Sequence, residues 1–429
     1  MCVVTTVTTR GGGGPCRGGE RQTPTRGWRG DASAAAGKAG SVEVEPAGQF
    51  AAGRKRALAA GALVVVASAA IVGAIASPSD ARGALDQSWP PFALIAGLLL
   101  IGVVAADDGL FDAVGGALAQ VPGSPALLFA LLMALVAVVT ALLNLDTSVV
   151  FLTPVLVHAA RSRRVGVAPF LYGAVFMSNS ASLLLPGSNL TNLLVLSTEH
   201  ERGGAFAARM LPAWFVAVVV TWGVLALLHR RELRVDAGPA DAPPPPRVGV
   251  GAVAIAVALV LILALAQPAP YVLGVGIAAS GVRLAQRRLT GAGVRRALNP
   301  WLLAGLFALV LALGTLARAW SGPSTVVHTS GPWATMSLGA IASILLNNLP
   351  AAVLFSARPL AHPRALLLGL NLGPNLAVTG SLAAILWLQI GRNLGERPSI
   401  RGYSTRGVCV AVPALVLGLG ALLALGRSV

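Results

Sequence analysis

The chain has 429 residues, of which 55% are hydrophobic and only 11% are charged. This composition is too apolar for a soluble domain of that length, so it indicates a membrane protein. The formal net charge of +16 does not indicate nucleic-acid binding, because the arginines lie in clusters between apolar segments and form no basic face with aromatic or polar readers.

The N-terminal segment 1–50 is rich in Gly, Thr, Ala and Arg and has no apolar periodicity, so we predict a disordered leader. A signal peptide is not expected, because the segment contains no apolar h-region. The first span is predicted at 57–77, directly after Arg54, Lys55 and Arg56. Since such charges are retained in the cytoplasm, we expect a multi-pass plasma-membrane protein with its leader on the cytoplasmic side.

Further apolar segments predict an all-α polytopic membrane protein. Besides the first span, we expect crossing helices at 91–106, 212–228, 248–266, 271–284, 301–316 and 408–425. An interfacial helix is predicted to begin at Phe111 and Asp112, with Asp107, Asp108 and Asp112 solvated. A Pro-rich stretch at 232–247 has no apolar run, so we predict a cytoplasmic linker there between repeat 1, at 51–231, and repeat 2, at 248–429.

Four polar stretches, at 144–148, 186–189, 347–350 and 371–375, interrupt apolar sequence. They carry amide and hydroxyl side chains together with Gly and Pro, which break helices and free backbone groups. Non-helical backbone at membrane depth is tolerated only where it is buried or lines a cavity. An Asn-rich stretch followed by a Pro/Gly/Asn stretch occurs in each half, which is typical of a secondary transporter with internal repeats.

From these interruptions we predict a re-entrant hairpin and a broken transmembrane helix in each repeat. The hairpins are expected at 125–160 and 333–355, and the broken spans at 170–198 and 365–390. Lys and Arg in the connecting loops indicate that the first hairpin opens to the cytoplasm and the second to the outside, which makes the repeats inverted. Three spans precede the second hairpin and two precede the first, so either repeat 1 has lost a helix or the leader takes its place.

At these interruptions the sequence resembles a known family. The stretch 379–383 with 386–388, preceded by 371–374, is similar to the signature of the arsenite/antimonite permease family of the ion-transporter superfamily. That superfamily also contains divalent-anion/sodium symporters and citrate-transporter-like domains. Three further motifs are similar to those of the family: 180–183 together with 188–190 and Asn192, Asp146 together with Thr153 and Pro154, and 347–350. The chain departs from the family at Asn179 and Asn371, where an acid is usual, at Asn375, where a lysine is usual, and at Leu145, which replaces an asparagine.

Asp146 is the leading candidate for ion coupling. It is the only acid well inside an apolar segment, where a carboxylate is unfavourable unless it pairs with a cation or takes a proton. The alternative is a structural cap on the hairpin tip. Burial disfavours the charged form and a bound cation favours it, so proton and cation would compete for one carboxylate.

Amides and hydroxyls at the four interruptions complete the predicted site. The candidates for solute or ion binding are Asn144, Asp146, Thr147, Ser148, Asn179, Ser188, Asn189, Asn192, Asn347, Asn348, Asn371, Asn375, Thr379 and Ser381. Helix capping and hydrogen bonding between helices are the alternative roles for the amides. The predicted helix-breaking residues are Pro186, Gly187, Pro350, Gly373 and Pro374. His158 and His229 are expected to be interfacial, and Arg209 and Arg318 to snorkel.

The sequence therefore predicts a secondary active transporter that works by alternating access. The resemblance implies an antiporter-like efflux permease for arsenite or antimonite, coupled to protons or driven by a partner ATPase subunit. Sodium- or proton-coupled transport of a small (di)carboxylate or inorganic anion is the alternative, and a homodimer is left open. A membrane-embedded enzyme is less favoured, because it would need a nucleophile with a base or a metal cluster, and no His/Asp/Glu cluster appears at ligand spacing. A passive channel is also less favoured, because it would have a continuous polar-lined pore in place of paired broken helices. Cys2, Cys16 and Cys409 show no metal or redox spacing, and we expect no metal or cofactor beyond H⁺ or Na⁺.

Overall fold

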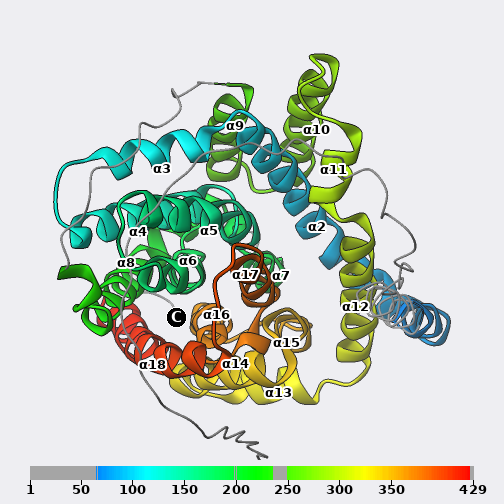
Figure 1. Cartoon of the computed structure of the whole chain (residues 1–429). Coiled ribbons are helices and arrows are strands. Elements are labelled where there is room, and N and C mark those ends of the chain that lie inside the picture. Colours follow the sequence, from blue (N-terminus) through cyan, green and yellow to red (C-terminus); the bar gives the residue numbers. More distant parts are fainter. Residues whose placement is uncertain (1–63, 65, 198, 200, 235–248, 426–429) are drawn as a thin grey trace, which may run out of the picture. The chain divides into compact units, whose positions relative to one another are not determined.

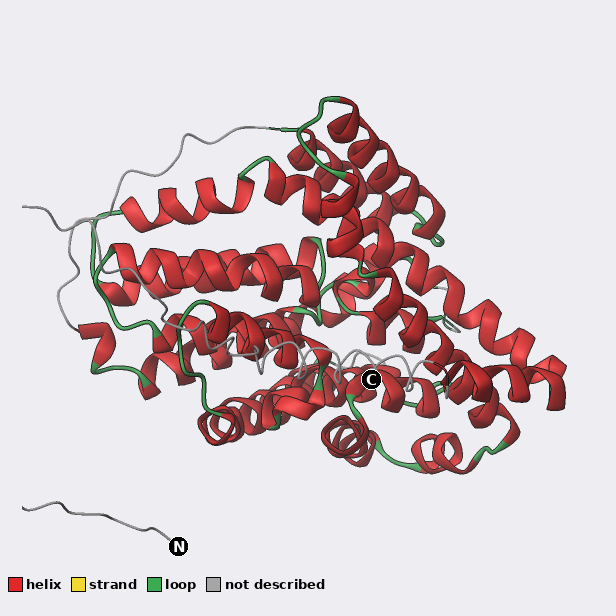
Figure 2. Ribbon diagram, turned by 45° about the vertical axis from the view of Figure 1, so that its right-hand side comes forward, coloured by secondary structure: helices red, strands yellow, loops and turns green. Residues whose placement is uncertain are grey.

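The computed structural model describes residues 64, 66–197, 199, 201–234 and 249–425. All of them belong to the unit Arg56–Val429. The leader predicted at 1–50, the start of the first span and most of the linker predicted at 232–247 lie outside the described residues. Within the described part every regular element is helical (Figure 2), which confirms the all-α class.

The first half consists of a short apolar helix, Val66–Ala76, and a series of elements that ends at Arg234. In chain order these are α2 Pro78–Asp107, α3 Leu110–Gln120, α4 Pro125–Leu142, α5 Leu145–Ser162, α6 Ala168–Ala181, η1 Pro186–Ser188, α7 Leu190–Leu196, α8 Gly203–Leu228 and η2 Glu232–Arg234.

The second half contains more helices before its hairpin than the first (Figure 1). Its elements are α9 Val250–Ala264, α10 Ala269–Ala285, α11 Gly291–Leu298, α12 Pro300–Ala319, α13 Gly322–Thr329, α14 Pro332–Leu346, α15 Asn348–Phe355, α16 Pro363–Leu372, η3 Gly373–Leu376, η4 Val378–Gly380, α17 Leu382–Asn393 and α18 Ile400–Ala424.

Several helices in the described part begin with a side-chain cap. The Ser124 hydroxyl accepts from the Leu127 N–H at 3.3 Å, and Pro125 occupies the first helical position of α4. A proline is favoured there, because the first N–H of a helix has no intrahelical partner. Ser399 caps α18 in the same way by accepting from the Gly402 N–H at 3.1 Å.

Both halves contain the same series of elements around the polar interruptions. In the first, α4 and α5 form a helical pair, α6, η1 and α7 form a broken helix, and α8 follows. In the second, α14 and α15 form the pair, α16, η3, η4 and α17 form the broken helix, and α18 follows. The predicted breaks near Asn144, Pro186, Asn347 and Gly373 are therefore confirmed. Opposite membrane orientation of the two series stays a prediction.

Three predicted helix starts were too late. The spans expected from 91, 212 and 408 begin at Pro78, Gly203 and Ile400. The added turns carry charged residues that a search for apolar segments rejects. Tertiary contacts satisfy several of those charges, as the Arg209–Glu201 ion pair at 2.7 Å illustrates. The short helices α11 and α13 were not predicted.

Glycines allow the helices outside the two series to pack closely. A Cβ on Gly97 of α2 would lie 2.7 Å from the Val272 carbonyl oxygen of α10, and one on Gly276 would lie 2.6 Å from the Gly97 carbonyl oxygen. Backbone contact of this kind requires residues without side chains. Together with α12, which also packs against α2, these helices form a framework beside the broken helices.

Among the described residues, five segments are long and apolar enough to cross a membrane: α2, α4, α8, Gly291–Ala319, which holds α11 and α12, and α18. At a rise of about 1.5 Å per residue, the 18-residue α4 would be about 27 Å long. Its length suits either a crossing helix or a hairpin arm, so the re-entrant topology stays a prediction.

Candidate functional site

The first hairpin tip is an asparagine-capped helix start. Asn144 has an extended backbone between α4 and α5, and its Oδ1 accepts from the Thr147 N–H at 2.7 Å. This bond satisfies one of the free N–H groups at the start of α5. Leu143 and Leu145 are 1% and 3% exposed, so the first tip is enclosed by protein.

The second hairpin tip repeats this chemistry. Asn347 has a φ of +83°, which is uncommon for a residue with a side chain. Its Oδ1 accepts from the Leu349 N–H at 3.3 Å, which caps α15. Its Nδ2 donates to the Thr379 carbonyl at 3.0 Å, so Asn347 also joins the hairpin tip to the second broken helix.

Pro350 lies in the first turn of α15, where a proline is compatible with a helix. Pro350 therefore does not break the helix as predicted. The break lies at Asn347, whose φ of +83° interrupts the path from α14 to α15.

At the first broken helix, side chains form hydrogen bonds with backbone groups that the break leaves without helical partners. Asn189 caps α7 by accepting from the Thr191 N–H at 3.2 Å. Asn192 Nδ2 donates to the Ser182 carbonyl at 2.7 Å, and the Ser188 hydroxyl donates to the Leu185 carbonyl at 2.6 Å. Asn192 thus makes a structural hydrogen bond of the kind that was the alternative to ligand contact, and Ser188 also bonds to the backbone.

The second broken helix has two short 3-10 turns where the first has one. Ser381 begins α17 by accepting from the Ala384 N–H at 3.2 Å. A Cβ on Gly380 would lie 2.6 Å from the Pro374 Cα, so the chain folds tightly back on itself here. The Tyr403 hydroxyl of α18 donates to the Pro374 carbonyl at 2.9 Å, which supplies a partner for a carbonyl freed by the break.

The starts of these four helices meet at one small cavity of about 50 Å³. Besides Leu306 of α12, it is lined by the first residues of α5, α7, α15 and α17, namely Leu145, Asp146, Asn189, Leu190, Thr191, Asn347, Asn348, Leu349, Ser381, Leu382 and Ala383. Helix N-termini carry free N–H groups and a partial positive charge. The cavity therefore suits oxygen-bearing solutes.

Asp146 is the acid that lines this cavity. No hydrogen bond or ion pair joins its carboxylate to another residue of the described part. No Arg, Lys or His belongs to the described lining. The predicted capping role belongs to Asn144, which leaves the Asp146 carboxylate available to a proton, a cation or a solute.

Four other predicted amides form a buried cluster between the two broken helices. Asn371 Oδ1 accepts from Asn189 Nδ2 at 2.6 Å, and Asn371 Nδ2 donates to Asn192 Oδ1 at 2.8 Å. Asn179 Nδ2 donates to Asn375 Oδ1 at 2.7 Å. Asn179, Asn192, Asn371 and Asn375 are fully buried and do not line the cavity.

The cluster offers a physical reason for the amide that replaces the usual acid at position 371. Asn371 Oδ1 accepts from Asn189 and also from Ser182, at 2.8 Å, while its Nδ2 donates to Asn192. An ionised carboxylate has acceptors only and could not donate to Asn192. The amide at position 371 therefore satisfies its neighbours without a buried charge, whereas Asn179 Oδ1 and Asn375 Nδ2 have no partner within the described residues.

The remaining predicted residues are distributed around the cavity and the cluster. Ser148 accepts from the Ser178 hydroxyl at 3.2 Å, whereas the buried Thr147 hydroxyl has no partner within the described residues. Thr379 donates to the Ile344 carbonyl at 3.3 Å, and Asn348 is buried beside the cavity. Thr191 and the apolar residues of the lining were not among the predicted site residues, although Thr191 lies between the motif residues Leu190 and Asn192.

Several charged residues outside the site have partners that the sequence did not predict. Asp108 is not solvated: it is buried, pairs with Arg283 and accepts from the Gly251 N–H at 2.7 Å. Asp107 and Asp112 are exposed as expected. Arg318 donates to Gln87 of α2, and Arg209 pairs with Glu201, so neither only snorkels.

Known proteins are similar to this chain in sequence and in fold. A model of the citrate transporter family matches residues 50–379. The chain belongs to this family. A solved structure, the YdaH transporter of Alcanivorax borkumensis, is similar in fold, with a TM-score of 0.55, 16% sequence identity, and coverage of 82% of this chain and 88% of that one. The chain is therefore a multi-pass α-helical membrane protein of the ion-transporter superfamily and a secondary transporter.

Its curated relatives include arsenical pump membrane proteins. The one from Escherichia coli (strain K12) is 26% identical over 388 residues, covering 82% of this chain and 90% of that protein. The one from Yersinia enterocolitica is 27% identical, and the match covers 83% of this chain and 91% of that protein. A 46 kDa membrane protein of Mycobacterium leprae is 23% identical, and the match covers 77% of this chain and 84% of that protein. These similarities agree with the resemblance drawn from the motifs.

Proposed function

We propose that this transporter exports arsenite or antimonite across the plasma membrane by alternating access. The observation that carries the proposal is the polar half of the cavity lining: amides, hydroxyls and one carboxylate at four helix starts. The other half consists of leucines and an alanine, and the described lining contains no cationic side chain. Neutral trihydroxy-arsenite presents hydroxyl groups that both donate and accept hydrogen bonds. It needs no counter-charge, so this lining matches it.

Cavity size supports a small inorganic solute over a carboxylate. A water molecule needs roughly 10–15 Å³ of such volume, so a cavity of about 50 Å³ holds only a few atoms of the size of a water oxygen. A tricarboxylate is larger than this and carries several negative charges. It would meet the Asp146 carboxylate without any arginine or lysine in the described lining to offset the repulsion.

Asp146 is the proposed coupling residue. Its carboxylate has no cationic partner in the described residues and lies at the start of α5, where an N-terminal helix dipole favours the ionised form. Loss of water around it favours the protonated form. A proton or Na⁺ that binds there changes the charge of the cavity, which would link solute release to an ion gradient.

The two hairpins and the two broken helices are the proposed moving elements. Hydrogen bonds from Asn371 to Asn189 and Asn192 join the two broken helices, and a bond from Asn347 joins one hairpin to a break. This cluster could move as one body beside the framework of α2, α10 and α12. Inverted repeats, a cytoplasmic N-terminal side, a partner ATPase subunit and a homodimer remain parts of the proposal.

Sodium- or proton-coupled uptake of a small anion is the second candidate. It is favoured by the helix starts around the cavity, since helix N-termini bind anions. The two candidates make opposite demands on the lining: an anion requires Asp146 to be neutral, whereas neutral arsenite does not.

The deciding experiment uses everted membrane vesicles that contain the full chain. Arsenite, antimonite, succinate and citrate are each tested under an imposed H⁺ gradient, an imposed Na⁺ gradient and no gradient. We expect gradient-driven, saturable accumulation of arsenite or antimonite. Accumulation of a carboxylate with no movement of arsenite would refute the export proposal, and non-saturable flux would indicate a channel.

A further inference from the structure

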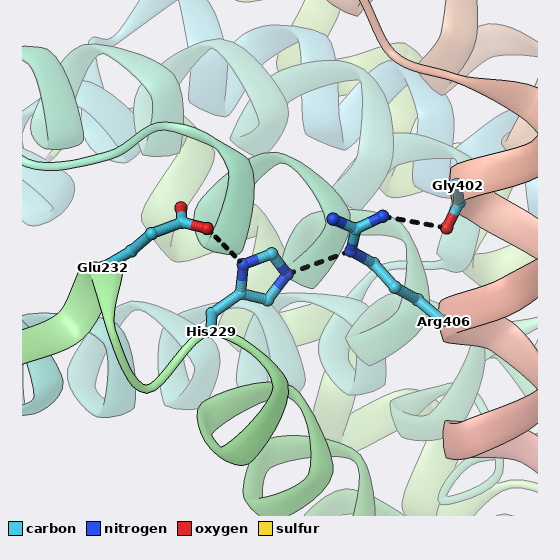
Figure 3. Close-up of polar contacts among 4 residues, drawn as sticks. All are labelled: His229, Glu232, Gly402 and Arg406. Carbon is cyan, nitrogen blue, oxygen red and sulfur yellow. Dashed lines mark hydrogen bonds and ion pairs between the residues drawn. The ribbon is translucent and has the colours of Figure 1, made fainter.

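A buried histidine connects the end of α8 to α18 (Figure 3). His229 is 2% exposed, and its Nε2 accepts from the Nε–H of Arg406 at 3.1 Å. A guanidinium group has donors and no acceptor, so Nε2 must offer a lone pair. The ring is therefore neutral with its proton on Nδ1, which donates to Glu232 Oε1 at 3.0 Å.

Arg406 is itself held in place by its surroundings. Its guanidinium lies over the Tyr172 ring of α6, 4.4 Å from the centroid, and its Nη1 donates to the Gly402 carbonyl at 3.1 Å. The Tyr172 hydroxyl accepts from the Ser399 N–H at 3.1 Å at the start of α18. The arginine therefore cannot leave His229 without disturbing the contact between α6, α8 and α18.

Among the described residues, Glu232 and Arg406 are the charged groups in direct contact with His229. The neighbouring arginines on its own segment, Arg230, Arg231 and Arg234, are exposed. Helix α4, which packs against α8 and η2, contains no titratable side chain, and α6 contributes Tyr172. The first turns of α18 add Arg401, which is exposed, and Tyr403, which points to Pro374.

Through the same part of α18, this contact reaches the second helix break. The Tyr403 hydroxyl donates to the Pro374 carbonyl, and a Cβ on Gly407 would lie only 1.7 Å from the Asn375 carbonyl oxygen. Tyr403 and Gly407 lie within one turn of Arg406. A shift of α18 at Arg406 therefore moves the groups that hold η3 in place.

We propose that His229 and Arg406 form a proton-sensitive latch that controls the second helix break. With His229 neutral, Arg406 holds α18 against η3. Protonation removes the Nε2 lone pair and places two positive groups next to each other, so the hydrogen bond is lost and the latch opens. Histidine is the side chain whose charge changes near neutral pH, so acidification around His229 is the signal to which the latch would respond.

The first test measures the latch without measuring transport. Spin labels are attached to Arg231→Cys and Arg401→Cys, both exposed, in a chain whose native cysteines are replaced by serine. Between about pH 8 and about pH 5, we expect a second, longer distance to appear in the protein with His229. His229→Gln keeps an acceptor for Arg406 and a donor for Glu232 without a charge, and it should show one distance throughout.

Two further variants make this test specific. Glu232→Gln removes the carboxylate that stabilises a protonated His229, so opening should shift to lower pH. His158→Gln changes an exposed histidine on α5 and should behave as the unmodified chain does. An unchanged distance in the His229 protein at low pH, or the same change in His229→Gln, would overturn the latch.

The second test measures how opening of the latch changes the transport rate, and it rests on the proposed function. Exchange of labelled for unlabelled arsenite is measured in proteoliposomes with the same pH on both sides, so no gradient acts. We expect the rate to fall at least about threefold between about pH 8 and about pH 5, in proportion to the latched fraction, and to fall less in His229→Gln. If no exchange occurs at any pH, the proposed function fails, while the spin-label distances still decide the latch.

Discussion

Asn371 in the second broken helix accepts a hydrogen bond from Asn189 in the first at 2.6 Å, across 182 positions of sequence. The same Asn371 side chain donates to Asn192. These two bonds join the helix breaks of the two halves directly, through fully buried or nearly buried amides. The position of one break is therefore determined in part by the other.

Asn371→Asp should destabilise the protein by about 1–3 kcal/mol, because Asn192 Oδ1 loses its donor and a charge is introduced in a buried place. Thermal unfolding of the purified protein in detergent measures the effect. Asn393→Asp, at the exposed end of α17, makes the same chemical change and should leave the unfolding temperature within error. Equal unfolding temperatures for the two variants would show that the amide cluster contributes no stability.

Gly407→Ala should disrupt the second helix break. The added Cβ would lie 1.7 Å from the Asn375 carbonyl oxygen, so α18 or η3 must move. Gly420→Ala is the matched change in the same helix, with nothing within 4 Å of the new Cβ. It should be neutral or stabilise by up to about 1 kcal/mol, since alanine favours a helix. A thermal unfolding series in which Gly407→Ala is as stable as Gly420→Ala would contradict the close contact.

Asp146→Asn should abolish accumulation of solute against a gradient and leave folding and membrane insertion intact. The amide keeps the size of the carboxyl group but cannot ionise, so no proton or cation can bind at a carboxylate. Vesicle uptake with and without an H⁺ or Na⁺ gradient tests this, with the exposed Asp112→Asn as control. Wild-type uptake with unchanged gradient dependence would move the coupling site to another residue.

The inverted-repeat proposal predicts which face of the membrane each hairpin opens to. Arg161→Cys follows the first hairpin and Arg358→Cys follows the second, and both positions are exposed. In a cysteine-free background, an impermeant maleimide should label position 358 in intact cells and position 161 only in everted vesicles. Labelling of both positions from one side would rule out inverted repeats.

The helix breaks were predictable from the sequence because their causes are local. Asn144, Asn189 and Asn347 each cap the helix that begins directly after them, and a polar residue inside an apolar segment marks that start. The candidate amides were likewise found because they lie near these breaks. Their division into cavity lining and buried cluster was not predictable.

Long-range partners explain what the sequence could not predict. Asp108 was expected to be solvated, because its partner Arg283 is 175 residues away. Arg318 and Gln87 meet across 231 residues, and such contacts allow polar turns to extend α2 beyond its apolar part. The hydrogen bond from Tyr403 to the Pro374 carbonyl was also not predicted, because no residue near position 403 in the sequence indicates a contact with the second break.

The two hairpin tips differ sharply in their surroundings. Leu345 and Leu346 beside the second tip are 74% and 50% exposed, whereas Leu143 and Leu145 beside the first are almost fully buried. A leucine uncovered at membrane depth meets lipid and not water, and lipid tails are as apolar as leucine, so the difference in burial costs little free energy. If the tips exchange environments during transport, the apolar area covered at one is uncovered at the other. The two end states would then have nearly equal free energy, and a modest ion gradient would be enough to set the direction of the cycle.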